Sequence, residues 1–378
     1  MRLVFNRDTL LSALEKICSI ASSKTTFAIL SSFLVEVKDG KCTFKSTDLT
    51  DIMYLSVEAQ TDEDGAFLLK GKETLEIVKG LPKGDVTFEL DKTAIKVSSG
   101  KFKANMNLAD ISEFPSVVVS DIDSGLRFKG SELKNALNQV SQFVASDTSR
   151  PEFCGVHLGY KFADKESIVT LVSTDGHRLA KTDLTADDVK ADEPNPDGYI
   201  LSTKAVLLLS KFFSEEDNVL FAVKKVNSEG NKAIFKGEKI TIVTSMIAGR
   251  YPDFSAVIPD ATNNIVVDKN LLIASLKRSA LFNPKQLTAR IEFAENNINI
   301  YSCGQMGNMS DDVECKYSGD KVVIGVNAKY LEQSLSIVDD LFAVIGVIDQ
   351  DSPIRIMSET DFDAKNFGTL SVVMPMQI

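Results

Sequence analysis

The feature that most constrains the fold is a threefold internal repeat. Residues 4–17 (VFNRDTLLSALEKI) match residues 127–140 (RFKGSELKNALNQV), and a weaker third copy covers residues 265–279 (IVVDKNLLIASLKRS). Each copy reads as a short β-type run, a polar break and an amphipathic helix with apolar residues at i, i+3, i+4 and i+7. The chain is therefore expected to fold into three similar domains of about 120 residues each.

Each predicted domain contains two similar halves. A strand, a polar break and a helix are expected again in residues 67–81, 199–213 and 322–337. Turn-rich joints at 120–125 and 255–264 separate the domains, which we predict at 1–122, 126–255 and 262–378. Alternating strands joined by Gly, Asp and Asn turns indicate mostly antiparallel sheets. The predicted class is α+β, with two helices per domain packed on outer sheets.

Composition removes several classes of function. Five scattered cysteines without a CxxC pair argue against a disulfide framework and a zinc site, and two histidines are too few for a multi-histidine metal centre. The longest apolar run, residues 341–348, is shorter than the roughly 20 residues that cross a bilayer, and is interpreted as a buried strand. The first residues lack a secretory signal. We expect a cytoplasmic protein with no metal, no cofactor and no membrane partner.

The charge distribution is more informative than the total. A net charge of −11 by itself argues against nucleic acid as a partner, because Lys and Arg dominate phosphate binding. Basic residues nevertheless stand beside all six predicted helices, from Arg7 and Lys16 at the first to Lys329 at the sixth. For one helix, a solvated face is the simpler interpretation. The recurrence favours a shared cationic surface, although glutamates such as Glu73 dilute it.

The stretch STDGHRLA at 173–180 resembles a reactive cluster. A catalytic interpretation would use Ser173 or Thr174 as nucleophile, His177 as base and Asp175 as the orienting group. The STD triplet recurs at 46–48 without a histidine, so Asp175 is interpreted as the residue of a turn after a strand. A hydrolase that uses His177 stays an alternative, and so does a repeat-built scaffold without DNA binding.

Four motifs together carry a family resemblance. They are STDGHRLA at 173–180, GRYPDF at 249–254, VNAKYL at 326–331 and VVMPMQI at 372–378. On these motifs the whole chain resembles the β subunit of bacterial DNA polymerase III, the sliding clamp. The resemblance implies a non-catalytic processivity factor, a head-to-tail homodimer that closes into a ring around double-stranded DNA without reading its sequence.

The resemblance also implies a groove between the second and third domains. The groove receives short hydrophobic peptides from the DNA polymerase III catalytic subunit, the clamp loader, other polymerases and repair proteins. From the residues alone, a core strand end is the favoured interpretation of VVMPM, and the resemblance reverses this order in favour of the groove. The matching positions are Phe153, Thr174, Gly176, His177, Arg178, Leu179, Pro252, Val257, Val372, Met374, Pro375 and Met376.

Two further sets follow from the same resemblance. The dimer contact is expected at Leu281 and Phe282, for which a role in the local core is the alternative. Two positions depart from the family pattern, Gln377 and the loop PEFCG at 151–155, and the sequence does not predict their effect on partner affinity. The residues expected to face DNA are Lys24, Lys72, Lys79, Arg150, Lys204 and Lys285.

Overall fold

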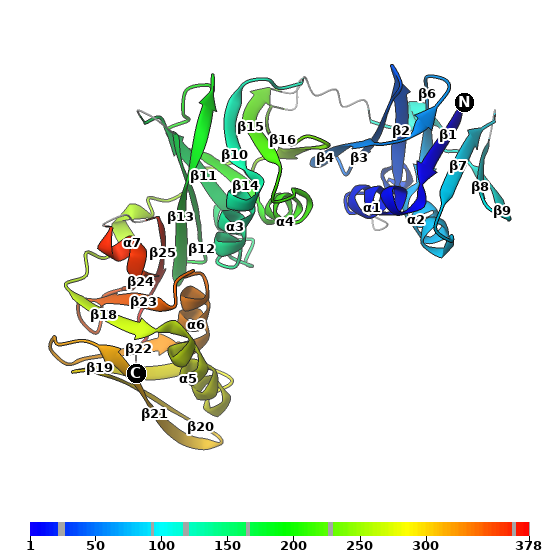
Figure 1. Cartoon of the computed structure of the whole chain (residues 1–378). Coiled ribbons are helices and arrows are strands. Elements are labelled where there is room, and N and C mark those ends of the chain that lie inside the picture. Colours follow the sequence, from blue (N-terminus) through cyan, green and yellow to red (C-terminus); the bar gives the residue numbers. More distant parts are fainter. Residues whose placement is uncertain are drawn as a thin grey trace. The chain divides into compact units, whose positions relative to one another are not determined.

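The chain is an α+β protein with antiparallel sheets (Figure 1). The structure is a computed structural model, and it describes residues 1–21, 27–91, 94–115, 121–163, 167–225, 230–364 and 368–377. All strand pairings within these ranges are antiparallel, which confirms the predicted fold class.

The described residues form two compact units. Unit 1 consists of Met1–Ser131, Asp187–Asp192 and Leu208–Met246, and unit 2 of Glu132–Ala186, Glu193–Leu207 and Ile247–Ile378. Strand pairing explains this division. In unit 1, β4 (Asp51–Val57) pairs with β17 (Ile240–Ser245), and in unit 2, β13 (Arg178–Val189) pairs with β25 (Thr369–Val373). Sheets thus continue from one repeat into the next, and the domain limits drawn from the repeats stay a prediction.

The six expected strand–helix pairs are all present. The polar break at three of them is a helix N-cap, because the side chains of Asn6, Asp268 and Asn327 accept hydrogen bonds from the first backbone amides of their helices. A further short helix, α7 (Glu359–Asp363), was not predicted. The six pairs are β1 (Arg2–Asn6) with α1 (Arg7–Ile17), β6 (Gly65–Lys70) with α2 (Gly71–Gly80), β10 (Gly125–Lys129) with α3 (Gly130–Ser141), β14 (Tyr199–Ser202) with α4 (Thr203–Phe212), β18 (Asn263–Asp268) with α5 (Lys269–Phe282), and β22 (Val322–Asn327) with α6 (Ala328–Ser336).

Unit 1 contains two sheets. Sheet A has the order β5-β1-β7-β8-β9, and sheet B the order β10-β15-β16-β17-β4-β3-β2-β6. Helices α1 and α2 pack against each other, and Phe5 on β1 contacts Phe44 and Phe88 edge to face in the core. The strands not yet delimited are β2 (Ser32–Lys38), β3 (Lys41–Thr47), β5 (Gln60–Thr61), β7 (Asp85–Leu90), β8 (Ala94–Ser99), β9 (Phe102–Asn107), β15 (Asn218–Lys225) and β16 (Asn231–Lys236).

Unit 2 also contains two sheets. Sheet C has the order β14-β11-β12-β13-β25-β24-β23-β18, and sheet D the order β22-β19-β20-β21. Its remaining strands are β11 (Gly155–Lys161), β12 (Ser167–Thr174), β19 (Thr288–Ala294), β20 (Asn297–Gly304), β21 (Gly307–Lys316), β23 (Phe342–Val347) and β24 (Ile354–Ser358).

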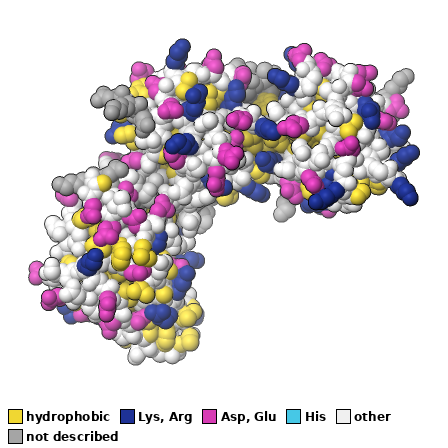
Figure 2. Space-filling view, viewed as in Figure 1, with side chains coloured by type: hydrophobic (Ala, Val, Ile, Leu, Met, Phe, Trp, Pro, Cys, Tyr) yellow, Lys and Arg dark blue, Asp and Glu magenta, His cyan; other side chains and the backbone are white. Residues whose placement is uncertain are grey.

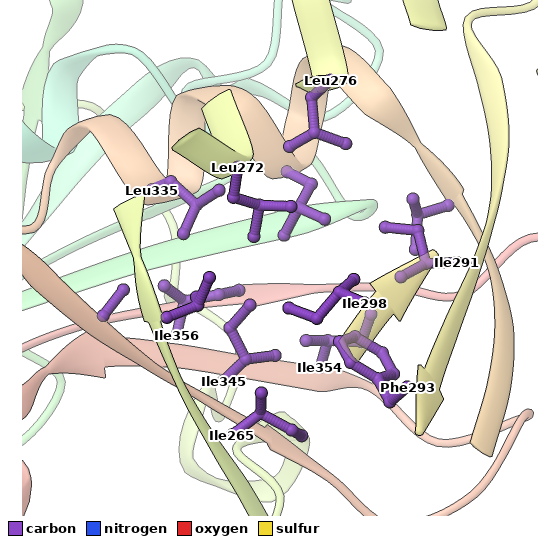
Figure 3. Packing of buried hydrophobic residues seen from close by; sticks show 14 of the residues in the cluster. Ile265, Leu272, Leu276, Ile291, Phe293, Ile298, Leu335, Ile345, Ile354 and Ile356 are labelled. Atoms are coloured by element: carbon purple, nitrogen blue, oxygen red, sulfur yellow. The ribbon is translucent and has the colours of Figure 1, made fainter. Parts of the chain in front are cut away.

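Helices α5 and α6 close the core of this unit from one side. Figure 3 shows Leu272 and Leu276 of α5 and Leu335 of α6 above isoleucines of both sheets. The apolar run at 341–348 forms β23, whose residues after Phe342 are all buried, as predicted. In the described part of the chain, no helix combines the length and the apolar character needed to span a membrane.

Candidate functional site

The motifs STDGHRLA and VVMPM lie side by side, although almost 200 residues separate them in the chain. Arg178 is paired with Val373 and Leu179 with Val372 across β13 and β25. Beyond β25, the Met374 amide donates to the His177 carbonyl at 2.8 Å, and the Met376 amide donates to the Gly325 carbonyl at 2.8 Å. We call the surface formed by Gly176, His177, Tyr330, Met374 and Met376 the candidate site.

The turn at Asp175 is built as the sequence predicts. The Asp175 carboxylate accepts hydrogen bonds from the amides of His177 and Arg178, both at 3.0 Å, and the Thr174 hydroxyl donates to the Arg178 carbonyl at 2.6 Å. The equivalent bonds recur in the first STD copy, where Asp48 accepts from the amides of Thr50 and Asp51. The motif therefore has a structural role in both copies.

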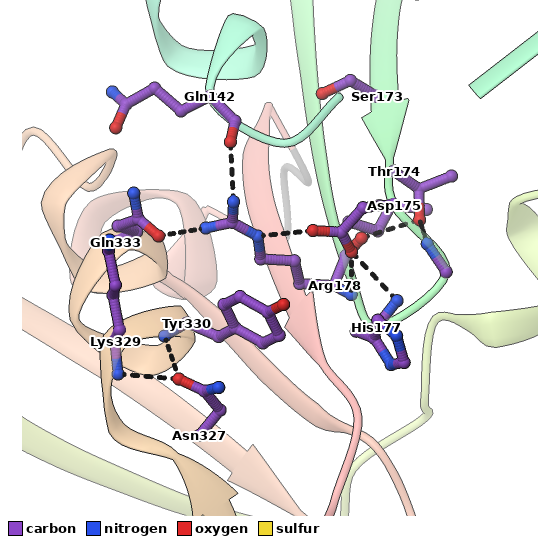
Figure 4. A network of polar contacts seen from close by, with 12 residues as sticks. Gln142, Ser173, Thr174, Asp175, His177, Arg178, Asn327, Lys329, Tyr330 and Gln333 are labelled. Atoms are coloured by element: carbon purple, nitrogen blue, oxygen red, sulfur yellow. Dashed lines mark hydrogen bonds and ion pairs between the residues drawn. The ribbon is translucent and has the colours of Figure 1, made fainter. Parts of the chain in front are cut away.

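Arg178 is buried and braces the site (Figure 4). Its guanidinium donates to the Asp175 carboxylate at 3.0 Å, to the Gln142 carbonyl at 2.8 Å and to the Gln333 side chain. It also lies 4.6 Å from the ring centroid of Tyr330. Its donors are used inside unit 2, so Arg178 holds neighbouring side chains and is not available as a free cation for a ligand.

His177 is exposed and stacks on Tyr330, with ring centroids 6.2 Å apart and an interplanar angle of 23°. Tyr330 lies in the first turn of α6, where the Asn327 cap accepts from its amide at 3.2 Å. Tyr330 is absent from the residues predicted for the groove. The signal for it was the motif VNAKYL, which contains both the cap and the ring.

The residues predicted for the groove differ in burial: some lie in the core and the others reach the surface. Thr174, Arg178, Leu179 and Val372 are buried, and Leu179 and Val372 belong to a core cluster that also includes Tyr251. The strand-end interpretation of VVMPM is thus right for its two valines. The remaining predicted residues reach the surface in part or fully, namely Phe153, Gly176, His177, Pro252, Val257, Met374, Pro375 and Met376. Apolar and thioether groups without a charge suit a variable apolar ligand.

Phe153 connects this surface to Arg150. The Phe153 ring contacts Tyr251 edge to face at 6.3 Å, and the exposed Arg150 guanidinium lies 5.5 Å from the Phe153 centroid. Both residues belong to the loop 150–154, which includes the short 3₁₀ turn Pro151–Cys154. A residue expected to face DNA and a residue expected to contact a peptide are therefore neighbours.

The geometry disfavours hydrolysis by His177. The Ser173 hydroxyl is buried and donates to the Val140 carbonyl, and the Asp175 carboxylate is occupied by two amides and Arg178. Neither side chain hydrogen-bonds the His177 ring, so a nucleophile, base and orienting group are not assembled here. Among the residues the structure describes, no cluster of His, Cys, Asp and Glu could hold a metal ion.

The basic residues fall into two kinds. Several near the helices brace the fold: Arg7 donates to the carbonyls of Val78 and Lys79, Lys269 to that of Val338, and Arg278 pairs with Asp311. Lys24 lies outside the described residues. The other members of the set expected to face DNA are exposed, namely Lys72 and Lys79 on α2, Lys204 on α4, Arg150 and Lys285.

The predicted dimer contact is an exposed apolar end of unit 2. Leu281 at the end of α5 is 63% exposed, Phe282 is half-buried, and Met306 between β20 and β21 is also exposed. Figure 2 shows hydrophobic side chains gathered where α5 and the β20–β21 strands end. An apolar patch of this kind is typical of a surface that another chain covers.

Comparisons with known proteins agree with one another. Residues 1–118, 127–253 and 255–377 match family models described as the N-terminal, central and C-terminal domains of the DNA polymerase III beta subunit. A beta sliding clamp of Chlamydia pneumoniae is 27% identical over 386 residues and covers 100% of this chain and 99% of its own. That of Haemophilus influenzae is 25% identical over 341 residues, 88% of each chain.

Solved structures share the fold over the whole length. The DNA polymerase III subunit beta of Pseudomonas aeruginosa superposes with a TM-score of 0.88 at 22% identity, and the beta subunit from the DNA polymerase of Streptococcus pyogenes with 0.90 at 21%. Both cover 100% of this chain and 100% of their own.

Proposed function

This chain belongs to the DNA polymerase III β subunit family, and from that premise we propose that two copies close into a ring around duplex DNA and tether the polymerase. The chain is a DNA sliding clamp, a processivity factor and not an enzyme. Its partners are DNA and a DNA polymerase. The head-to-tail dimer, the residues that contact DNA and the peptide site are our proposals.

The ring is supported by one observation: the same pairing between strands of different repeats, which we call a strand junction, occurs twice. In unit 1, β4 and β17 pair with Asp51 opposite Thr244 and Leu55 opposite Ile240. In unit 2, β13 and β25 pair in the identical register, with Arg178 opposite Val373 and Thr182 opposite Thr369. In each case the strand that follows the STD position of one repeat pairs with the last strand of another.

The third pair of equivalent strands lacks this junction. The strand after the STD position of the third repeat is β21, and the last strand of the first repeat is β9. Within the described residues, β9 pairs only with β8, and β21 pairs with β20 and, through Cys315 and Lys316, with β18. An unpaired strand edge is a template for another chain. The equivalence supports pairing of β21 with β9 of a second copy, and two such junctions close a ring.

The proposed DNA contacts are made by a small set of basic side chains that attract phosphate groups. Exposed Lys72, Lys79, Lys204, Arg150 and Lys285 supply positive charge to an otherwise acidic chain, and Lys24 joins them by family resemblance. A clamp holds DNA by enclosing it, so weak phosphate contacts that do not depend on sequence are sufficient. This accounts for DNA binding by a protein with a net charge of −11.

The candidate site is proposed to bind hydrophobic peptides of the DNA polymerase III catalytic subunit, the clamp loader, other polymerases and repair proteins. His177, Tyr330 and Met376 offer an aromatic and thioether surface that repacks around different side chains. Arg178 contributes indirectly, because it fixes the turn that carries His177 and contacts the Tyr330 ring.

The test is retention on DNA of different topology. Loaded by its clamp loader, the protein should stay on nicked circular DNA and leave linear DNA with free ends within the same time. Charge reversal at Lys72 and Arg150 should reduce loading on the circle several-fold, because phosphate attraction is lost. Gel filtration of labelled protein with each DNA measures both.

His177→Ala is the matched control. Once loaded, this variant should stay on circular DNA as long as the unaltered protein, because His177 is not among the residues proposed to contact DNA. The amount loaded and the length of the products in a polymerase extension assay should both fall, because the clamp loader and the polymerase are proposed to bind the candidate site. Equal loss from circular and linear DNA would contradict enclosure, and unchanged loading after charge reversal would favour the scaffold hypothesis.

A further inference from the structure

The two strand junctions share one register but differ in the side chains that support them. Two of the differing positions face each other across the junction, and the third lies on the first helix of the repeat. All three are polar and uncharged in unit 2, whereas unit 1 has two apolar residues and a lysine there. The counterparts in unit 2 and unit 1 are Thr182 and Leu55, Thr369 and Ile240, and Gln139 and Lys16.

In unit 2, Gln139 of α3 links the second repeat to the third. Its side chain accepts a hydrogen bond from the Thr182 hydroxyl at 3.2 Å and donates to the Asp339 carboxylate at 3.1 Å and to the Ile337 carbonyl at 3.3 Å. The Thr182 hydroxyl also lies 2.7 Å from the Thr369 hydroxyl, directly across the junction. Gln139 and Thr182 are buried, so water competes little for these hydrogen bonds.

Further hydrogen bonds connect the same two repeats. Ser371 of β25 donates to the Leu179 carbonyl on β13 at 2.8 Å, and its oxygen lies 2.8 Å from the Ser334 hydroxyl on α6. Arg178 donates to the Gln333 side chain of the same helix. Hydrogen bonds weaken steeply with distance and angle, and a buried polar group that loses its partner costs free energy. A small displacement between these repeats therefore breaks several interactions at once.

In unit 1, the middle of the junction is apolar. Met53 and Leu55 of β4 lie opposite Ile242 and Ile240 of β17, and all four are buried. The side chain of Lys16 makes no hydrogen bond or ion pair with the rest of the described chain. Apolar attraction has no preferred direction, so β4 and β17 can shift against each other at little cost while these side chains stay covered.

The polar links of this junction lie toward its two ends. The Thr244 hydroxyl donates to the buried Asp51 carboxylate at 2.7 Å. At the other end, Lys239 pairs with Glu58 at 2.7 Å, and these side chains are 66% and 79% exposed. An ion pair that is so exposed to water contributes little to stability.

A cavity of about 440 Å³ lies beside the apolar part of this junction, where α1 meets β4. Its wall includes Lys16 and Leu55, the counterparts of the two residues whose side chains are hydrogen-bonded to each other in unit 2. Close-packed side chains resist displacement because they have no free volume to enter. Lys16 and Leu55 have such volume next to them, so the first helix and β4 can adjust to a change in the junction.

We propose that the β4–β17 junction is a hinge at which the chain flexes, and that the β13–β25 junction is rigid and preserves the candidate site. The site depends on β25, because Met374 directly follows this strand and donates its amide to the His177 carbonyl. A closed ring has to open before it can admit circular DNA, and the hinge takes up this change within unit 1. The inference rests on the proposed function, because it assumes that the chain forms a ring.

Hydrogen exchange of the purified full-length protein, followed by mass spectrometry, tests the difference between the junctions. Relative to their intrinsic rates, the amides of residues 51–55 and 240–244 should exchange at least tenfold faster than those of 178–182 and 369–373. The neighbouring strands β16 and β24 are the internal references and should be equally protected, because they do not belong to a junction. Equal exchange at the two junctions, or faster exchange of β16 that matches that of β17, would overturn the proposal.

Gln139→Met and Lys16→Met introduce the same side chain at equivalent positions. Gln139→Met removes the buried amide and should speed exchange of 178–182 and 369–373 at least threefold. Lys16→Met is the matched control and should leave 51–55 and 240–244 unchanged, because the Lys16 side chain has no partner to lose in the described chain. Thr182→Val, which removes only a hydroxyl, should act like Gln139→Met and replaces it if thermal unfolding shows that Gln139→Met is not folded. Unchanged exchange in the unit 2 variants would overturn the proposal.

A second arm separates this inference from the proposed function. Tyr54 and Thr241 lie opposite each other on β4 and β17, so a Tyr54→Cys, Thr241→Cys variant can be cross-linked by oxidation across the hinge. The clamp loader should load the oxidised variant on circular DNA several-fold more slowly than the same variant after reduction. The unaltered protein, treated with the same oxidant, controls for the native cysteines. Equal loading of the oxidised and reduced variant would overturn the hinge and leave the function intact, whereas no loading of the unaltered protein would contradict the function itself.

Discussion

Arg178 supports the turn and the ring that form the candidate site from a buried position beneath them. Its guanidinium is buried, and a buried charge is stable only when its donors are matched by acceptors. Asp175, Gln142 and Gln333 supply those acceptors. Three segments of unit 2 therefore converge on a single side chain.

Removal of this side chain should be costly. Arg178→Met removes the side-chain donor of Gln333, of the Gln142 carbonyl and of one Asp175 oxygen, while the other Asp175 oxygen keeps its two backbone amides, and we expect a loss of about 3–5 kcal/mol in the free energy of unfolding. His177→Ala, at the adjacent exposed position, should cost less than about 1 kcal/mol. Urea unfolding followed by circular dichroism measures both. Similar losses in the two variants would show that Arg178 is not the brace.

Asp175 and Arg178 differ in how far the sequence predicts their roles. The role of Asp175 was predictable, because the same triplet occurs at 46–48 without a histidine. The burial of Arg178 was not, because Gln142 and Gln333 lie 36 and 155 residues away. Only the folded chain brings such partners together. Tyr330 was missed for the same reason, since the motif VNAKYL places its ring in the first turn of a helix but does not indicate that the ring stacks on His177.

At the scale of elements, the two STD turns differ in one informative position. The residue after the aspartate is left-handed in both copies, with φ of 77° at Leu49 and 85° at Gly176. A left-handed backbone costs an L-residue about 1–2 kcal/mol and glycine very little. The first repeat therefore carries a strain that the second avoids.

Substitutions at Leu49 and Gly176 should change the free energy of unfolding in opposite directions. Leu49→Gly should raise the free energy of unfolding by up to about 1 kcal/mol, after the greater flexibility of glycine in the unfolded chain is subtracted. Gly176→Leu should lower it by about 1–2 kcal/mol through the backbone alone, because nothing lies within 4 Å of the added Cβ. Gly176→Asn, which tolerates this conformation, is the control. Chemical denaturation measures these free energies. A Gly176→Leu variant that is more stable than the unaltered protein would show that the left-handed backbone does not strain a leucine at this position.

The helices and their strands were predictable because their signal is periodic and recurs in each repeat. The five-residue helix α7 was not, because it is too short for an apolar period to emerge. Charge on the helices was harder to interpret. Lys269 and Arg278 of α5 are basic residues in the sequence, but both bind groups of the same chain. Lys269 donates to the Val338 carbonyl, and Arg278 forms an ion pair with Asp311.

The proposed ring depends on equivalence between the repeats. The β4–β17 and β13–β25 junctions share one register, and β21 and β9 are the equivalent strands without this pairing in the described chain. The repeats were visible in the sequence. The junctions were not, because strand pairing between distant segments leaves no periodic trace in either segment.

The proposed dimer requires that the second copy covers the C-terminal end of α5. Leu281 and Leu271 lie on this helix and are 63% and 55% exposed, but only Leu281 lies at its C-terminal end, beside the half-buried Phe282. If β21 pairs with β9 of a second copy, the apolar end of α5 becomes covered, and a charge there is desolvated. Leu281→Asp should weaken the dimer at least tenfold in sedimentation equilibrium, and Leu271→Asp should leave it unchanged. Since both substitutions put one carboxylate on an exposed position of the same helix, a general effect of charge would act on both. Equal dissociation of the two variants, or a dimer insensitive to Leu281→Asp, would place the junction elsewhere and break the equivalence on which the ring depends.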